Sequence, residues 1–228
     1  MTTKNSISGS ARGKRESAKQ LRWVREHGLS LSFTALFLVC VTGQSIAGHT
    51  SYNAELAAHG IHQISYEAYL DTGNFLDGIF VNWQAALLQL TCLVLLGTRL
   101  REKGAAHSLT TRKSAERRRK RDGMRRPWVY RNSLTLALGG LFILCLAAHL
   151  IFGAMDYNEQ MRMVGKPAIS TLAFGANSTF WFTTLQTSEA GFAAIAIYVV
   201  FSIYLRQQGS PESKPVDSSN EVTGKTNH

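Results

Sequence analysis

The sequence predicts an all-α integral membrane protein with four transmembrane helices. They form two parallel tandem repeats of a helix–outer-loop–helix unit, with both termini cytoplasmic. Three observations predict this fold. Four long apolar segments occur in the 228-residue chain, the sequence repeats itself 105 positions later, and Lys and Arg gather in alternate connecting segments. Each apolar segment is long enough for a helix to cross a hydrocarbon core, which needs roughly 20 residues.

The internal repeat runs without a gap. Of the 86 positions from 23 to 108, 22 carry the same residue 105 positions later, where chance pairing of average compositions gives about six. The matches include loop residues: Tyr52-Asn53 recurs as Tyr157-Asn158. We therefore expect repeat 1 at 23–108 and repeat 2 at 128–213. Because each repeat crosses the membrane twice, the two have the same orientation and are related by an axis along the membrane normal.

The elements follow in order from composition. Residues 1–22 are rich in Ser, Lys, Arg and Gly and are expected to form a disordered basic tail. Repeat 1 is expected to hold transmembrane helices at about 29–48 and 75–98, with room for a short interfacial helix at 65–70 in the outer loop. A basic linker at 109–127 leads to helices at about 133–155 and 180–205. A disordered tail at 214–228 is expected to end the chain.

Charge predicts the orientation in the membrane. Of the 25 Lys and Arg, 13 lie between residues 99 and 131, seven lie before residue 26, and only two lie in the loop after the third segment. The positive-inside rule therefore places both termini and the linker in the cytoplasm. The linker is expected to contact anionic lipid headgroups through Arg117, Arg118, Arg119, Lys120 and Arg121. No nucleic-acid partner is expected, because no aromatic stacking residues accompany this run.

Polar residues inside the apolar segments are the first candidates for function, because burying them in lipid is costly. Counted from the cytoplasmic ends, four of them share one depth in the outer third of the membrane: Gln44, Gln84, His149 and Glu189. Three interpretations stay open. The layer is a set of helix–helix hydrogen bonds, or His149 and Glu189 form an ion or proton site, or the layer closes a pocket for a quinone-like or lipid molecule. That pocket would be lined by Trp83, Phe182 and Phe192.

No catalytic residue and no cofactor is expected. Haem ligation between helices needs two intramembrane histidines at matching depth, and only His149 lies well inside a segment. The outer-loop histidines His49, His59 and His62 are weak candidates for a metal site, and a solvated loop is the simpler interpretation. The three cysteines all lie in apolar segments, so the chain predicts no disulfide framework.

Several short motifs resemble an uncharacterised bacterial family of multi-pass, four-helix membrane proteins, known as a domain of unknown function. They are Tyr52-Asn53, Gly73-Asn74-Phe75-Leu76, Asn82-Trp83-Gln84, Leu205-Arg206-Gln207-Gln208-Gly209-Ser210 and Glu212-Ser213-Lys214. The resemblance implies a setting in the bacterial inner membrane and carries no activity or site residues. The family pattern in the second helix is similar to Asn-Trp-x-Ser-Glu, and here no acidic residue follows Asn82-Trp83-Gln84.

The sequence thus favours a non-enzymatic structural or interaction component of the bacterial inner membrane. One alternative is a small transporter or ion- or proton-conducting subunit that uses the polar layer. A second alternative is a binder of a quinone-like or lipid molecule. The expected partners are the bilayer with its anionic headgroups and another membrane protein or a second copy of the chain.

Overall fold

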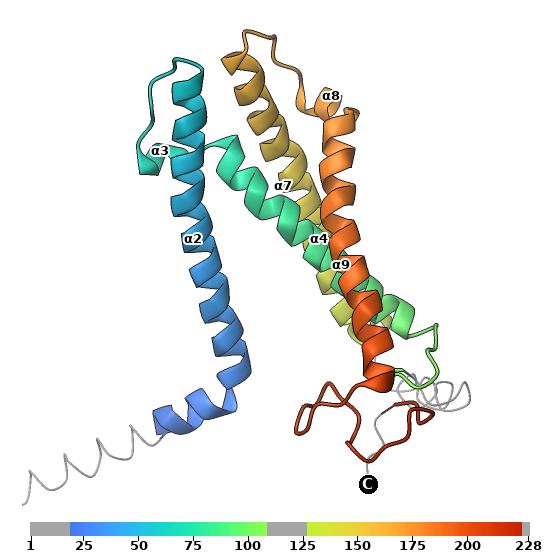
Figure 1. Ribbon diagram of the computed structural model, residues 1–228. Coiled ribbons are helices and arrows are strands. Elements are labelled where there is room, and N and C mark those ends of the chain that lie inside the picture. Colours follow the sequence, from blue (N-terminus) through green and yellow to red (C-terminus); the bar gives the residue numbers. More distant parts are fainter. Residues whose placement is uncertain (1–18, 109–126, 225–228) are drawn as a thin grey trace, which may run out of the picture. The chain divides into compact units, whose positions relative to one another are not determined.

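The computed structural model describes residues 19–108 and 127–224, and its described part contains helices and loops but no strand (Figure 1). The four predicted transmembrane helices are confirmed as helices long and apolar enough to cross a membrane. They are α2 (Gly28–Ala58), α4 (Gly73–Gly97), α7 (Ser133–Met163) and α9 (Ser178–Tyr204). Shorter helices are α3 (Tyr66–Leu70), α6 (Trp128–Arg131) and α8 (Thr171–Gly175).

The long helices show apolar side chains over most of their surface. Val39 on α2 is 68% exposed, Leu144 on α7 is 67% exposed and Phe182 on α9 is 65% exposed. Contiguous apolar surface on this scale is rare on soluble monomers. In lipid it costs nothing, because the surrounding chains are as apolar as the side chains. The helices therefore have the surface of a multi-pass membrane protein.

Two of the long helices extend beyond their apolar segments. The sequence places their outer ends at about 48 and 155, whereas α2 continues to Ala58 and α7 to Met163. The added residues mix polar side chains with Ala, Leu and Met and contain no Gly or Pro, so nothing in them stops a helix. Both helices stop at a glycine with positive φ, Gly60 (71°) and Gly165 (70°). At each end, paired backbone hydrogen bonds form a Schellman motif, with Ile61 N donating to Leu56 O at 2.9 Å in the first.

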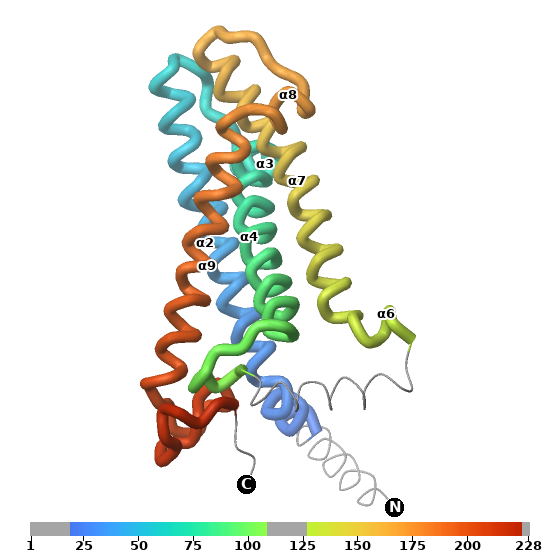
Figure 2. The backbone as a smooth tube through the Cα atoms, turned by 90° about the vertical axis from the view of Figure 1, so that its right-hand side faces the viewer, coloured from blue at the N-terminus to red at the C-terminus, as the bar shows by residue number. Residues whose placement is uncertain are grey.

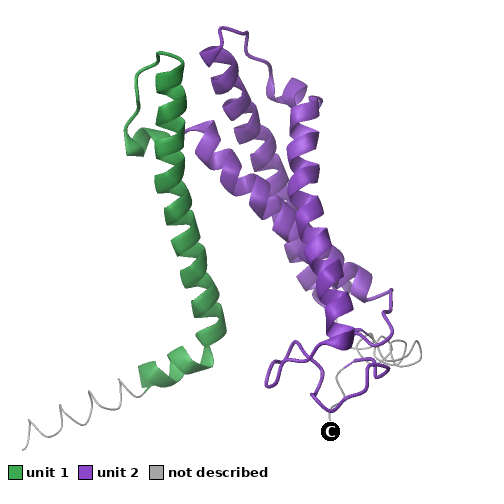
Figure 3. Cartoon of the chain, viewed as in Figure 1, with its two compact units in different colours: residues 1–69 green, residues 70–228 purple. Residues whose placement is uncertain are grey.

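The chain forms two compact units, Met1–Tyr69 and Leu70–His228 (Figure 3). In unit 1, the outer loop folds back along α2. The Asn53 side chain fastens this loop to α2 through both backbone groups of one loop residue: it accepts from Ile64 N at 2.9 Å and donates to Ile64 O at 3.0 Å. Gly48 leaves room for the Tyr69 ring of α3, because a Cβ at Gly48 would lie 2.1 Å from the Tyr69 hydroxyl oxygen.

Unit 2 is organised around α4, which packs against both α7 and α9 (Figures 1 and 2). The α4–α7 contact is antiparallel. One end of the contact brings Gly73 to the backbone of Asp156, and the other end brings Thr91 to Gly139. Helix α8 lies against both α7 and α9, and its Phe174 is buried with Ala154 and Phe180 in the core of this unit.

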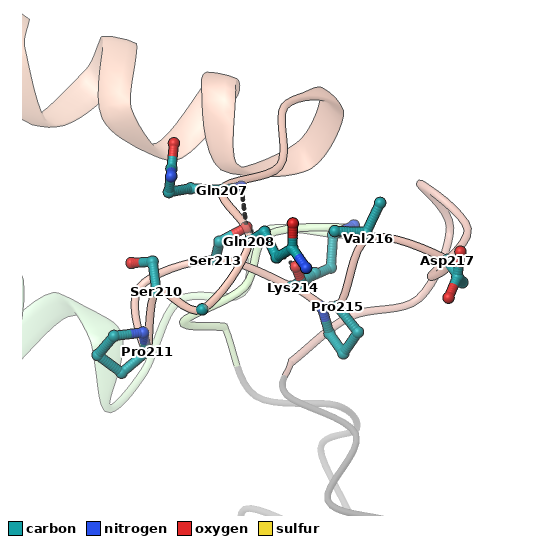
Figure 4. Close-up of a pocket in the computed structure, with 10 residues that line it drawn as sticks. Gln207, Gln208, Ser210, Pro211, Ser213, Lys214, Pro215, Val216 and Asp217 are labelled. Carbon is teal, nitrogen blue, oxygen red and sulfur yellow. Dashed lines mark hydrogen bonds between the residues drawn. The ribbon is translucent and has the colours of Figure 1, made fainter.

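A folded segment follows α9. Residues 205–224 make turns around Lys214, which is 1% exposed and donates to Gly104 O at 2.6 Å, Val222 O at 3.2 Å, Asn220 O at 3.3 Å and Ser219 O at 3.4 Å. Figure 4 shows the loop before it, where Gln207 N donates to Ser213 Oγ at 2.9 Å. A disordered tail from residue 214 is therefore not what the structure shows for 214–224. The lysine ammonium group donates hydrogen bonds to backbone carbonyls and orders the segment, and the composition of the segment does not show these contacts.

Candidate functional site

The α4–α7 contact brings together an aspartate and a histidine 72 positions apart in the sequence. Asp77 Oδ1 lies 2.5 Å from His149 Nδ1. The His149 side chain is 1% exposed and that of Asp77 is 15% exposed. Both residues belong to helices with the length and hydropathy of membrane spans. The pair is therefore a buried acid–imidazole contact in the apolar part of unit 2.

Glycine makes this contact possible. A Cβ at Gly153, one turn along α7 from His149, would lie 3.0 Å from Asp77 Oδ1 and 2.9 Å from Phe174 Cε1. A Cβ at Gly73, one turn before Asp77, would lie 2.2 Å from the backbone nitrogen of Asp156. Small residues at such points let two membrane helices approach closely. The carboxylate reaches the imidazole because neither glycine holds the helices apart.

An aromatic ring covers one face of the imidazole. The Phe180 ring stacks on His149 with a centroid distance of 4.9 Å and an interplanar angle of 19°. Phe174 packs edge-on against Phe180 at 5.7 Å. With Nδ1 held by Asp77, the second ring nitrogen Nε2 is buried and has no hydrogen-bond partner within the described residues. One nitrogen of the imidazole is thus engaged and the other is left open.

Two more acids lie at the outer end of the same helix contact. Glu159 accepts a hydrogen bond from Gly73 N at 3.2 Å. Asp156 accepts from Gln160 at 2.8 Å and from the Asn74 side chain, while its Oδ1 is buried without a partner in the described part of the chain. His149 and Asp156 are seven residues apart, or about 10 Å along α7. Acidic groups therefore continue from the pair toward the outer end of the helices.

Gln84 lies on α4 one heptad beyond Asp77 and is 1% exposed. Its Nε2 lies 3.5 Å from Thr184 Oγ1 of α9, while its Oε1 is buried with no partner among residues that the structure describes. Positions seven apart lie on the same face of a helix. One face of α4 thus presents a carboxylate to α7 and an amide to α9.

The polar layer predicted from depth divides into buried and exposed members. Gln84 and His149 are buried, whereas Gln44 on α2 and Glu189 on α9 are exposed. The structure does not bring Glu189 to His149: the carboxylate that contacts the imidazole is Asp77. Counting residues along a helix gives depth but not the direction of a side chain, and on α9 the buried neighbour is Ser188.

Asp77 was not among the predicted site residues, although the sequence carries a signal for it. It is an acidic residue inside the second apolar segment, seven positions before Gln84 and so on the same face of the helix. An ionisable residue within such a segment is a functional candidate by its cost alone. Its closeness to the end of the segment makes it resemble an interfacial residue, and only the packing of α4 against α7 brings it to His149.

The other predicted residues are scattered. Trp83 contacts Phe80 edge-on at 5.8 Å and is 41% exposed, and Phe182 is 65% exposed. Phe192 lines a cavity between α4 and α9 whose wall includes neither Trp83 nor Phe182. The basic run at positions 117–121 lies outside the described residues.

The outer-loop histidines have separate positions in unit 1. His49 Nε2 lies 2.9 Å from Ile64 O, and His59 Nδ1 lies 2.9 Å from Glu55 O. His62 is exposed. Within residues 19–108 and 127–224, no group of three or more His, Cys, Asp and Glu side chains is arranged to hold a metal ion.

Residues 20–225 match the model of one protein family, described as a domain of unknown function (DUF6766). The chain belongs to this family. No curated protein and no solved structure matches the chain. Together with the four apolar helices, the match confirms the resemblance to a multi-pass membrane domain of unknown function.

Proposed function

We propose that this member of DUF6766 is a non-enzymatic component of the bacterial inner membrane that binds a proton at the Asp77–His149 pair. The contact between Asp77 Oδ1 and His149 Nδ1, buried between two membrane helices, is the observation that supports this function. Free imidazole titrates at about pH 6.5, so a histidine is the side chain that changes charge at physiological pH.

The Nε2 atom of His149 is the atom that would bind the proton. When His149 is neutral and donates its Nδ1–H to an ionised Asp77, its lone pair is on Nε2. That atom has no partner within the described residues. A proton bound at Nε2 converts the pair from a net negative charge to neutrality, which a medium of low dielectric constant favours. Asp156 and Glu159 supply further proton acceptors between the pair and the outer end of α7.

The proposal is tested by nuclear magnetic resonance of the full chain in lipid nanodiscs with ¹⁵N-labelled histidine. We expect the His149 ring signals to change when the pH is lowered, because Nε2 takes up a proton. Asp77→Asn should abolish this change, because the anionic partner of the imidazolium is lost. Glu189→Gln is the matched control, since it removes an exposed membrane carboxylate with no contact to His149. If the two variants behave alike, or His149 does not titrate, the pair only holds the helices together.

A second measurement separates proton binding from proton movement. Liposomes containing the protein and a trapped pH-sensitive dye report flux after a pH jump. Flux that disappears in Asp77→Asn but persists in Glu189→Gln makes the chain a proton-conducting component. Titration without flux restricts the role to a membrane component whose packing responds to pH.

We also propose that the two halves of the chain are tandem repeats. Helix α7 begins and ends 105 residues after α2, α8 begins and ends 105 residues after α3, and α9 begins 105 residues after α4. The second outer loop has the same fastening, because Asn158 accepts from Ile169 N at 2.8 Å and donates to Ile169 O at 2.9 Å. Gly153 faces Phe174 as Gly48 faces Tyr69. Two copies of one folding unit account for these shared details.

The orientation in the membrane is part of the same proposal. Four crossings place both termini on one side, and the basic segments assign that side to the cytoplasm. The linker at 109–127 then lies beside the inner leaflet, where its basic residues attract anionic headgroups. Cysteines introduced at positions 19 and 224 should react with a membrane-impermeant reagent only after the cells are opened. Labelling of either position in intact cells would overturn this orientation.

A further inference from the structure

A second site lies at the other end of unit 2. Helices α4 and α9 diverge there and leave a cavity of about 680 Å³, within the range of roughly 300–1,000 Å³ usual for small-molecule sites. Its walls are apolar and come from both helices, with Leu93 and Leu96 on α4 and Ile195 and Val199 on α9. The lining reaches Gly97, the last residue of α4, and Ser202, two residues before the end of α9 at Tyr204.

Charged residues from the segments that follow the two helices form the rim. Arg101, Glu102 and His107 come from the segment after α4, and Glu212 comes from the segment after α9. His107 Nε2 lies 2.8 Å from Glu212 Oε2, and the Tyr198 hydroxyl lies 3.4 Å from the same oxygen. The cavity therefore changes from apolar to charged at the level where the helices leave the apolar segment.

Hydrogen bonds of Lys214 and Thr223 hold the two rim segments together. Lys214, two residues after Glu212, is fixed by its four backbone carbonyl contacts, one of them to Gly104 of the other rim segment. Gly104 N also donates to Thr223 Oγ1 at 2.9 Å. Binding groups held this way lose little freedom when a ligand arrives. The backbone of the two rim segments is thus fixed, while the Arg101 and Glu102 side chains are exposed and can reach a ligand.

We propose that this cavity binds one phospholipid with a zwitterionic, amine-bearing headgroup. The apolar walls accept an acyl chain, and Arg101 is the only rim cation without an ion pair in the described part of the chain, so it is available to a phosphate. Glu102 and Glu212 offer two carboxylates to an ammonium group. An anionic headgroup without an amine would leave Glu102 without a cation, because the cation beside Glu212 is His107. A neutral quinone would leave the charges of Arg101 and Glu102 without a partner.

Native mass spectrometry of the full chain released from nanodiscs tests this site, with phosphatidylethanolamine and phosphatidylglycerol as the probes. We expect one phosphatidylethanolamine retained per chain, in preference to phosphatidylglycerol. Arg101→Ala should reduce retention about tenfold, the size of one charge-assisted hydrogen bond. Arg99→Ala is the matched control, because this arginine lies at the same helix end outside the cavity wall. Preference for phosphatidylglycerol, or equal loss in both arginine variants, would overturn the proposal.

A second pair of variants tests the cavity itself and keeps the proposal separate from proton binding. Ile195→Trp fills the apolar wall and should abolish retention, whereas Ile197→Trp places the same ring on an exposed position of α9 and should not. If both variants retain lipid equally, the bound lipid belongs to the annulus around the helices. Asp77→Asn should leave retention unchanged, so failure of one proposal does not carry over to the other.

Discussion

The closest approach of α4 and α7 allows the sharpest test of the structure. A Cβ added at Gly73 would lie 2.2 Å from the Asp156 backbone nitrogen and 2.7 Å from the Asp156 Cα. Real Cβ contacts under 3.0 Å essentially never occur, and backbone atoms of a neighbouring helix cannot rotate away. In Gly73→Ala the two helices must therefore separate by about 1 Å or more at this end. Overpacking of this kind costs about 1–3 kcal/mol.

The same displacement reaches the proposed proton site. Asp77 follows Gly73 by one turn, so separating the helices lengthens its contact with His149. We expect Gly73→Ala to lower the free energy of unfolding by about 2–3 kcal/mol and to weaken the protonation signal of His149. Unfolding is measured by titrating the protein in mixed micelles with sodium dodecyl sulfate, and protonation by the histidine spectra.

Gly140→Ala is the matched control for this experiment. Nothing lies within 4 Å of a Cβ at Gly140, so the variant should fold at least as well as the wild type. Alanine favours helix over glycine by up to about 1 kcal/mol. If the two alanine variants agree in stability to within about 0.5 kcal/mol, the helices do not approach as described, and the account of the pair fails with them.

Three further predictions concern the loops and the segment after α9. Gly48→Ala should destabilise unit 1, because the added Cβ would clash with the Tyr69 hydroxyl. Tyr69→Phe in the same chain should partly restore thermal stability, since the phenyl ring of Phe174 faces Gly153 in the same way. If stability is not restored, the hydroxyl is not the cause. Asn158→Ala removes two hydrogen bonds to the second outer loop, so we expect faster hydrogen exchange at residues 166–170 and a loss of about 1–2 kcal/mol of local stability; unchanged exchange would refute it. Burial, and to a smaller extent the charge of Arg206, lowers the pKa of Lys214 from 10.5. The folded segment therefore binds fewer protons than the unfolded one as pH rises toward 10.5, so its resistance to proteolysis should increase from pH 8 to about pH 10. A decrease over this range would show that the pKa is shifted in the opposite direction.

Much of the proposed site depends on the direction of side chains around each helix. Depth along a helix follows from counting, and two of the residues chosen in this way, Gln84 and His149, are buried. The same counting places Glu189 at the same depth, although its side chain is exposed on α9 and the neighbouring Ser188 is buried. Long helices that are apolar on all sides carry no amphipathic pattern, so the sequence does not mark which face meets a neighbour.

The segment after α9 shows a second kind of limit. Its residues are polar, with two prolines, and composition alone assigns such a stretch to disorder. Its order comes from one lysine whose ammonium group meets carbonyls of residues 104, 219, 220 and 222. Contacts of this type depend on where the ends of α4 and α9 meet, which no local pattern specifies.

The sequence by itself determined the number of long helices, because a bilayer accepts only segments that satisfy every backbone group internally and are apolar for about 20 residues. It also determined the 105-residue internal similarity, which needs no coordinates. Only the tertiary structure decided that Asp77 pairs with His149, that α4 lies against both α7 and α9, and that the segments after α4 and α9 form a rim at the cavity. The reason is physical: hydropathy acts on each helix alone, whereas pairing depends on the points where glycine lets two backbones meet.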